Sequence, residues 1–295
     1  MKALRKTKRR GAALMLSLWA LFLLSAMVIS WALDIHARLT LSGHANRILE
    51  AEALACSGAE VAMYPNIQLD SPALVGGFGR DQRYEARITG EGGRLNINWL
   101  AAGENPVRIE VLRKYLEIKG IDLDERDLMI DALLDWVGQN TGLHRLNAPP
   151  ESDNYHPSHA PLKRLDELKK IKGWEEFTSA KDWDADLTLD STGPIDIKWA
   201  SRDILLALPG ASEDRVDQFL TLRSGADGID GTQDDPLITD AQVVLGIPPQ
   251  QLAGLIGTDQ VLRVVSVGKS GDVTRTVRVV FVKGNTQSLK SWKEF

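Results

Sequence analysis

The chain has 295 residues, of which 43% are hydrophobic and 25% are charged, and this composition excludes a wholly disordered protein. Its length allows one large domain or two small ones. The single cysteine, Cys56, excludes an intramolecular disulfide and a multi-cysteine zinc or iron–sulfur site. Residues 1–11 hold six Lys or Arg and no acid, whereas the remainder of the chain carries a net charge of −11. A basic tip on an acidic body argues against bulk nucleic-acid binding and points to a membrane.

Residues 12–33 form an uncharged apolar run of 22 residues. As a helix rising about 1.5 Å per residue, the run would span roughly 33 Å, enough to cross the hydrocarbon core of a bilayer. The positive charges before it predict a cytoplasmic N-terminus, with the rest of the chain across the membrane. A secretory signal and a plain anchor are two interpretations. A third, a pilin-type leader, also explains why Gly11 stands at the junction of the basic and apolar parts.

The helix is expected to continue beyond the membrane, to about Tyr64-Pro65-Asn66. No proline occurs between residues 34 and 63, and apolar or small residues recur at spacings of three and four. The residues of this face are Ile35, Leu39, Ile48, Ala51, Ala55, Ala59 and Ala62. The alternative is a juxtamembrane amphipathic helix of no special role.

Two β-rich segments are predicted on either side of a helical block. In residues 66–103, the alternating runs Tyr84–Thr89 and Leu95–Leu100 predict a hairpin around Gly92-Gly93. In residues 259–295, β-branched runs at 261–267 and 274–282 predict a second hairpin. Residues 104–258 show helical periodicity, and acidic residues there outnumber the 16 basic ones. The expected helices are 107–118, 125–137, 162–171, 201–208, 213–222 and 241–245. The predicted fold class is therefore α+β, an antiparallel sheet with a large inserted α-helical domain.

Several blocks in a fixed order resemble one known family. They are Lys8–Leu14, which resembles a class III leader, followed by Gly93–Leu100, Asp131–Trp136, Asn147-Ala148-Pro149 and Leu165–Gly173. The chain resembles the protein K family of type II secretion systems, the large minor pseudopilins.

The resemblance implies a pseudopilin fold whose domains are a leader (1–11), a transmembrane helix (12–65), a β segment (66–103), an inserted α-domain (104–258) and a completing β segment (259–295). It implies cleavage by a prepilin peptidase between Gly11 and Ala12, and a single-pass inner-membrane protein with its C-terminal domain in the periplasm. It also implies a non-enzymatic role at the tip of the pseudopilus, among other minor pseudopilins, in export of folded periplasmic proteins. These partners are expected to be contacted partly through the helical face over Ile35–Ala62.

Leu16 is the fifth residue if the mature chain begins at Ala12. Most pilins and pseudopilins are similar in having a glutamate there, thought to neutralise the N-terminal amine of the adjacent subunit, whereas protein K lacks it. A carboxylate in lipid is costly unless paired, so Leu16 fits a subunit with none above it. The simpler explanation is that leucine is the least costly residue in a membrane span.

An acidic loop at residues 227–235 contains Asp227, Asp230, Asp234 and Asp235, with two glycines between them. Calcium takes six to eight oxygen ligands, and glycines let carboxylates converge. The spacing is not that of an EF-hand, and a solvated acidic turn is the alternative. Calcium is favoured because the resemblance implies calcium in the α-domain.

Residues 204–222 resemble a helix-hairpin-helix, which predicts a second function: a membrane-anchored periplasmic DNA-binding protein. The acids Glu213, Asp214 and Asp217 would repel phosphate, so a packing role is favoured and no nucleic-acid partner is expected. His144, His156 and His159 are interpreted as a polar loop rather than a zinc site. No nucleophile elbow, P-loop or dinucleotide motif occurs, so no enzyme is expected.

Overall fold

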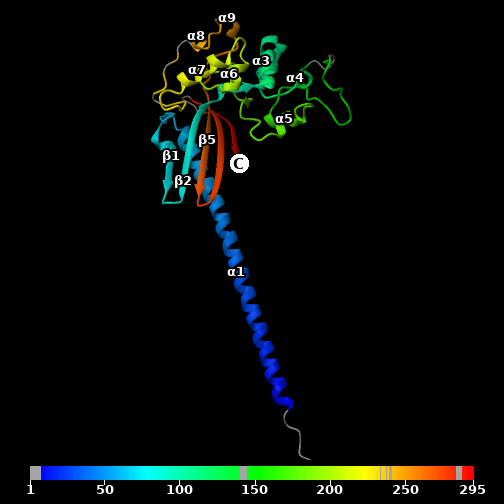
Figure 1. The fold of residues 1–295 in the computed structure, drawn as a ribbon, viewed down its shortest axis with the longest axis vertical. Helices are drawn as coiled ribbons and strands as arrows, with labels where there is room; N and C mark the ends of the chain where they lie inside the picture. Colours follow the sequence, from blue (N-terminus) through cyan, green and yellow to red (C-terminus); the bar gives the residue numbers. More distant parts are fainter. Residues whose placement is uncertain (1–7, 140–144, 233, 237, 239–240, 284–287) are drawn as a thin grey trace, which may run out of the picture.

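The computed structural model describes the chain except for residues 1–7, 140–144, 233, 237, 239–240 and 284–287. It has three parts (Figure 1): a long helical stalk, a sheet wrapped against the upper part of that stalk, and a helical body above the sheet. The fold is α+β, as the sequence predicts.

Helix α1 (Lys8–Met63) is a single helix of 56 residues, as expected from the absence of proline. Its upper part is rich in alanine, and Ala51, Ala55 and Ala59 are fully buried against the sheet. Small side chains are needed because the backbones approach closely: a Cβ added at Gly268 of the sheet would lie 2.0 Å from the carbonyl oxygen of Ala51. Glycine and alanine therefore set the distance between helix and sheet.

The sheet has five antiparallel strands in the order β1-β2-β5-β6-β7. They are β1 (Val75–Phe78), β2 (Gln82–Gly90), β5 (Val261–Ser270), β6 (Val273–Val282) and β7 (Ser288–Glu294). Alternate residues face α1 and form a small core with it, among them Ile88, Val264, Val277 and Phe281. The other face of the sheet is directed away from α1.

Strands β2 and β5 are neighbours although the whole helical body lies between them in the chain. Gly90 pairs with Leu262 at the end of this ladder, so the chain leaves the sheet after Gly90 and returns at Val261. The α-helices and strands between β2 and β5 are α2 (Ile97–Ala101), α3 (Pro106–Ile118), α4 (Leu123–Val137), α5 (Glu175–Ser179), α6 (Arg202–Ala207), α7 (Glu213–Arg223), α8 (Ala241–Leu245), α9 (Pro249–Leu252), β3 (Leu95–Asn96) and β4 (Leu187–Thr188).

The helical body has its own, larger core, built around Trp174, Tyr115, Phe219 and Met129, all at most 1% exposed. Helices α3, α4, α6, α7 and α8 match the segments expected from periodicity. The segment expected over 162–171 is instead a short 3₁₀ helix at Leu165–Lys170. Helix ends follow ordinary capping: Asn105 caps α3 and Ser201 caps α6 through their side-chain oxygens.

The first predicted hairpin is wrong. Strand β2 pairs with β1 and β5, and the run Leu95–Leu100 does not pair with it. Leu95 and Asn96 form β3, which pairs in parallel with β4, and Asn96 then caps helix α2 by accepting a bond from the Trp99 N–H. Leu95 and Ile97 are both fully buried, so this run belongs to the core of the helical body. Alternation of apolar and polar residues over six positions could not distinguish a strand of the main sheet from a buried segment of the helical body.

Two strands of the five-stranded sheet were not expected. Strand β1 lies within the segment 66–81, which reads as a loop because it is rich in Gly, Pro and Asp. Strand β7 reads Ser-Leu-Lys-Ser-Trp-Lys-Glu and lacks β-branched residues. Both are edge strands, and each is held by pairing to one neighbour only. Each pairs with the strand next to it in the chain, and this pairing makes it a strand although its own residues have low β-propensity.

Candidate functional site

The lower part of α1 is a bare apolar surface. Residues 12–33 are all exposed, and the most apolar window of this helix has a mean hydropathy of 2.4 with none of it buried. Among the described residues, one helix, α1, is long enough and apolar enough to cross a membrane, judged by length and composition. The hydroxyl of Ser17 donates to the Leu14 carbonyl at 2.9 Å, so this polar group is satisfied within the helix. The lower part of α1 is therefore a candidate membrane anchor.

The sequence-predicted residues of this anchor lie at its N-terminal end. Ala12 and Leu16 are exposed, and the Leu16 side chain, between Met15 and Ser17, is 71% exposed. Gly11 lies in the helix backbone. Most of the expected leader, residues 1–7, falls outside the described residues. The cleavage between Gly11 and Ala12 remains a prediction.

The helical face predicted over Ile35–Ala62 divides into two parts. Ala51, Ala55, Ala59 and Ala62 are buried under the chain's own sheet. Leu39 is exposed and Ile48 is half-buried. The face is expected to provide part of the contacts with other subunits, and its upper part cannot do so because the chain's own sheet already covers it. Only the part from Ile35 to about Ile48 is open to another molecule.

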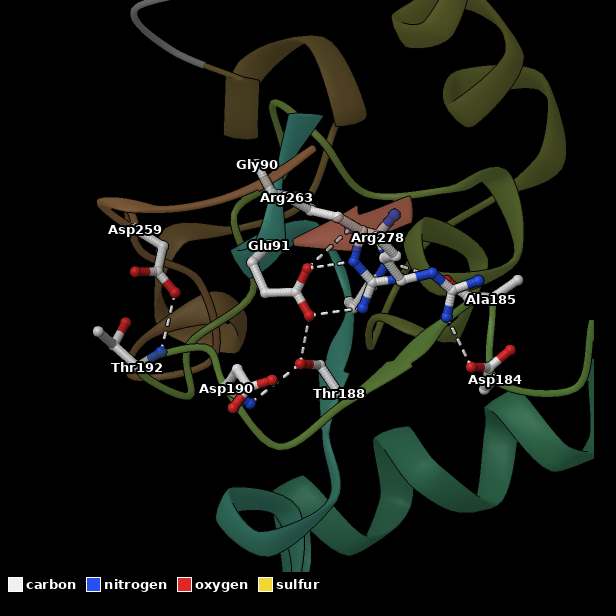
Figure 2. A network of polar contacts seen from close by, with 11 residues as sticks. Gly90, Glu91, Asp184, Ala185, Thr188, Asp190, Thr192, Asp259, Arg263 and Arg278 are labelled. Carbon is white, nitrogen blue, oxygen red and sulfur yellow. Dashed lines mark hydrogen bonds and ion pairs between the residues drawn. The ribbon is translucent and has the colours of Figure 1, made fainter. Parts of the chain in front are cut away.

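A buried ion pair joins the sheet to the helical body. Glu91 follows β2 and is 0% exposed, and Arg263 of β5 is 6% exposed. The Arg263 guanidinium donates to both carboxylate oxygens of Glu91, from Nε at 2.6 Å and from Nη2 at 2.6 Å. The Thr188 hydroxyl, in β4, also donates to Glu91 (Figure 2). One carboxylate thus ties β2, β5 and β4 together.

Further ion pairs surround this centre. Arg94 lies within 3.4 Å of Glu91 and donates to the carbonyl oxygens of Gly90 and Ala185. Burial and, after it, the nearby charge of Arg263 lower the pKa of Arg94 to about 10. Arg278 of β6 bonds Asp184 at 2.7 Å (Figure 2). We call this group of Glu91, Arg94, Thr188, Arg263 and Arg278 the polar junction.

The polar junction was not found from the sequence. Glu91 and Arg263 are 172 residues apart, and of the five members only Arg94 stands in a motif block, Gly93–Leu100. The nearest signal is Gly92-Gly93, interpreted as a turn. A Cβ at Gly93 would lie 2.4 Å from the backbone of Trp199, so the glycine is required by a close crossing of two segments. The crossing sets the position of Glu91.

The acidic loop brings together three of its four predicted carboxylates. Asp227, Asp234 and Asp235 each place an oxygen within 4.8 Å of the others. Asp230 is engaged elsewhere: Arg223 of α7 donates to both of its oxygens, at 3.0 and 2.8 Å. Asp230 is therefore not available as the ligand that was expected.

The three clustered carboxylates are held by the loop backbone. Asp234 accepts bonds from the Ala226 and Asp227 N–H groups and from the Thr232 hydroxyl. These bonds, that of Thr232 first, lower the pKa of Asp234. Asp235 accepts from the Gly231 N–H at 2.6 Å. Ionised oxygens held at fixed positions are the donor type that calcium takes, although the same bonds also satisfy an acidic turn.

The helix-hairpin-helix resemblance corresponds to α6, a turn and α7. Gly210 in the turn has a φ of +80°, a conformation that favours glycine. Arg202 donates to Asp217 at 2.7 Å and lies within 3.4 Å of Glu213. The bond from Arg202 lowers the pKa of Asp217. Arg202 is thus already paired with acids, and the acids around the turn argue against a phosphate site.

The histidines do not form a cluster among the described residues. His159 contacts the Gly138 carbonyl through Nδ1 at 3.1 Å and Glu151 through Nε2 at 2.9 Å. The contact with Glu151 raises the pKa of His159. His144 lies outside the described residues, and His156 is not part of any candidate metal group in the described part of the chain.

Blocks quoted for the family resemblance meet in the helical body. Asn147 donates from its backbone N–H and side-chain amide to Asp131 Oδ2, the latter at 2.9 Å. Asn98 exchanges two bonds with the backbone of Leu162, at 2.8 and 2.9 Å. These motif residues have structural roles, since each joins two segments of the body.

Comparison of the sequence finds no matching family model and no matching curated protein. The fold is similar to a chain of the crystal structure of the GspK-GspI-GspJ complex from the type 2 secretion system of enterotoxigenic Escherichia coli, with a TM-score of 0.57. The match has 13% identity and covers 89% of this chain and 99% of that chain. Because the identity is low, the match establishes the fold: a pseudopilin fold with a large helical body.

Proposed function

We propose that the chain is a minor pseudopilin of a type II secretion system and acts at the tip of the pseudopilus in export of folded periplasmic proteins. The observation that carries this proposal is the combination of a bare apolar helix, its sheet and the bulky helical body, matched over nearly the full length of the similar chain. In the proposal, the protein has a structural role and catalyses no reaction. Its location would be the inner membrane, with residues after 33 in the periplasm.

Tip placement follows from two features. Leu16 offers no carboxylate to the N-terminal amine of a subunit above it, and an uncompensated amine in lipid is costly. The body between Gly90 and Val261 is larger than the sheet from which it emerges (Figure 1). Such a body needs lateral room that neighbouring subunits of a packed filament would not leave.

The proposed partners are other minor pseudopilins, by analogy with the assembly named for the similar structure. Contact would be made through the open part of α1, from Ile35 to Ile48. Leu39→Cys, in a Cys56→Ser background, should form crosslinks with minor pseudopilins in cells, because Leu39 is 67% exposed. Ala55→Cys is the matched control: it is fully buried under the sheet and should form none. Equal capture of the major pseudopilin through Leu39→Cys would contradict tip placement.

The export role has its own test. Deletion of the gene should trap the folded cargo of the secretion system in the periplasm, measured as the ratio of periplasmic to secreted protein. Reintroduction of the wild-type chain should restore secretion. Normal secretion without the chain would contradict the proposal, even if the protein were found in the membrane.

Processing by prepilin peptidase is part of the same proposal. The mature chain would begin at Ala12, and Gly11→Val should block cleavage because the larger residue does not fit at the scissile position. N-terminal sequencing of the protein from cells with and without the peptidase measures this. A mature N-terminus near residue 32 would instead indicate an ordinary signal peptide.

We also propose that Asp227, Asp234 and Asp235 hold a calcium ion. The support is their convergence within 4.8 Å and the bonds that fix their orientation. A bound ion would relieve the repulsion among three neighbouring carboxylates and stiffen the loop after α7. The alternative function, binding of DNA by the α6–α7 turn, receives no such support, because Arg202 is paired with acids.

A further inference from the structure

A positively charged groove lies between the sheet and the helical body. It is a cavity of about 470 Å³, with one wall from β6 and β7 and the other from segments 163–165 and 187–190. Six cationic side chains line it: Lys163, Arg164, Arg263, Arg278, Lys290 and Lys293. Asp184 and Asp190 are its two acids. The excess of positive charge is unusual in a chain whose net charge is −5.

The strand register explains why cations gather on this wall. Arg278 pairs directly with Lys293, and Arg263 pairs with Val280, which itself pairs with Ser291. Directly paired residues project to the same side of a sheet, and here that side is the one turned away from α1. The groove therefore lies on the sheet face opposite α1, at the end next to the helical body.

Two of the six cations are already neutralised. Arg263 is bound by Glu91, and Arg278 is bound by Asp184. In contrast, Lys163, Lys290 and Lys293 form no ion pair within the described ranges of the chain, and Arg164 approaches Asp166 only to 3.9 Å. Three lysine charges thus remain unpaired, and Arg164 is paired only through a long, exposed contact.

The remaining acid of the groove, Asp190, only partly offsets these charges. Burial and the nearby charge of Glu91 raise its pKa. Its side chain is half-buried and has no ion pair among the described residues. One carboxylate of this kind still leaves the groove with an excess of positive charge.

Protection of an exposed edge is the competing explanation for two of the lysines. Strand β7 ends the sheet, and lysines on edge strands prevent pairing with other chains. That explanation accounts for Lys290 and Lys293. It does not account for Lys163 and Arg164, which come from the opposite wall and belong to no strand. Cations that converge from two separate walls indicate a site for a ligand.

We propose that this groove binds an acidic, extended segment of another protein. Carboxylates complement the three unpaired lysines and Arg164, and in the described part of the chain β7 leaves one edge without a strand, along which an extended chain can lie. Ligand carboxylates placed on alternate residues would face one wall, as in any extended chain. This inference rests on the charge and shape of the groove and does not depend on the proposed role in secretion.

The test uses the full-length protein in a non-ionic detergent and a fluorescent ten-residue peptide of alternating Glu and Ser. Fluorescence anisotropy should show binding that weakens as salt is raised from low to physiological ionic strength. The same peptide with Gln in place of Glu should not bind. Lys290→Glu and, on the other wall, Lys163→Glu should each weaken binding at least tenfold; both side chains are exposed, so the fold should tolerate the changes.

The matched control is Arg215→Glu, which makes the same change of charge on the exposed surface of α7 and should alter the affinity less than twofold. An equal loss in Arg215→Glu would overturn the proposal, because it would show only an effect of net charge. Displacement of the peptide by an equimolar amount of inorganic phosphate would also overturn it, in favour of a small-anion site. Tighter binding to phosphatidylglycerol vesicles, abolished by Lys290→Glu, would overturn it in favour of a membrane surface.

Discussion

At the scale of single residues, the polar junction depends on one carboxylate. Glu91 is fully buried and accepts bonds from Arg263 and Thr188. Burial of two ions costs several kcal/mol, which the pair recovers only when its hydrogen bonds are complete. The pair therefore fixes the relative position of sheet and body more than it adds to stability.

Loss of Glu91 should be strongly destabilising. Glu91→Ala would leave the Arg263 charge buried without its partner, so the free energy of unfolding should fall by about 3–5 kcal/mol. Denaturant unfolding at neutral pH measures this. As a control, Glu85→Ala removes an exposed carboxylate from β2, the strand that precedes Glu91. It should change the free energy of unfolding by no more than about 0.5 kcal/mol. The interpretation is wrong if the two variants are equally stable.

His159 should make stability depend on pH. Both ring nitrogens face oxygen acceptors, and Glu151 raises the pKa above the ordinary 6.5. The charged imidazole is therefore favoured in the folded state. This contribution is fully present below the unfolded pKa and is lost as pH rises through the higher folded pKa.

The corresponding measurement compares melting temperatures at about pH 5.5 and 8.5, which bracket the ordinary pKa of histidine. His159→Asn should lower the melting temperature more at the acidic pH than at the alkaline one. Glu151→Gln should reproduce this pattern, because it removes the charge that favours the imidazolium. An effect of His159→Asn that is the same at both pH values would show that its packing matters and its protonation does not.

At the scale of elements, the α1–β5 contact depends on the absence of side chains. A Cβ at Gly268 would lie 2.0 Å from the Ala51 carbonyl and 2.4 Å from the Ala55 nitrogen, both backbone atoms that cannot move aside alone. Gly268→Ala should therefore push α1 away from the sheet and cost more than the typical 1 kcal/mol of a point mutation. Thermal unfolding followed by circular dichroism measures the loss.

Gly43 provides the control for that experiment. It lies in the same helix, with nothing within 4 Å of the position of an added Cβ. Gly43→Ala should be neutral or stabilise the helix by about 0.5–1 kcal/mol, since alanine has the higher helix propensity. Destabilisation by Gly43→Ala comparable to that by Gly268→Ala would mean that the close contact is not the cause.

The acidic loop has a test that separates its two kinds of aspartate. Asp234→Asn should lower the melting temperature in calcium but leave it nearly unchanged in chelator, because a ligand stabilises only the state that binds it. Asp230→Asn breaks the bond to the buried Arg223 and should destabilise the protein equally in both conditions. If Asp234→Asn has the same effect with calcium and with chelator, the loop is an acidic turn.

At the scale of the whole molecule, the stalk and the globular part are energetically separate. Residues 12–33 are exposed throughout, so they add no packing to the sheet or the body. A chain that begins at Asp34 should dissolve without detergent and melt at the same temperature as the full-length protein in detergent. A chain that begins at Gly58 loses Ala51 and Ala55 and should not form the sheet, because the alanine face of α1 completes that core.

The sequence by itself determined the features that depend on local patterns. The uncharged run of 22 residues predicted the long helix, and the spacing of apolar residues predicted α3, α4, α6 and α7 within a few positions. The order of the motif blocks also led to the correct fold class. Residues of these blocks, such as Asn98 and Asn147, bond one segment of the helical body to another. The β-branched runs likewise predicted β5 and β6.

Only the tertiary structure decided which segments meet. Leu95–Leu100 alternates like a strand, yet it enters the core of the body because β5 occupies the place beside β2. The alanine face of α1 reads as a surface for a partner, but the chain's own sheet covers it. Glu91 and Arg263 are 172 residues apart, and Asp230 is taken by Arg223. Pairings at such separations leave no periodic signal, because they are selected by the packing of the complete chain.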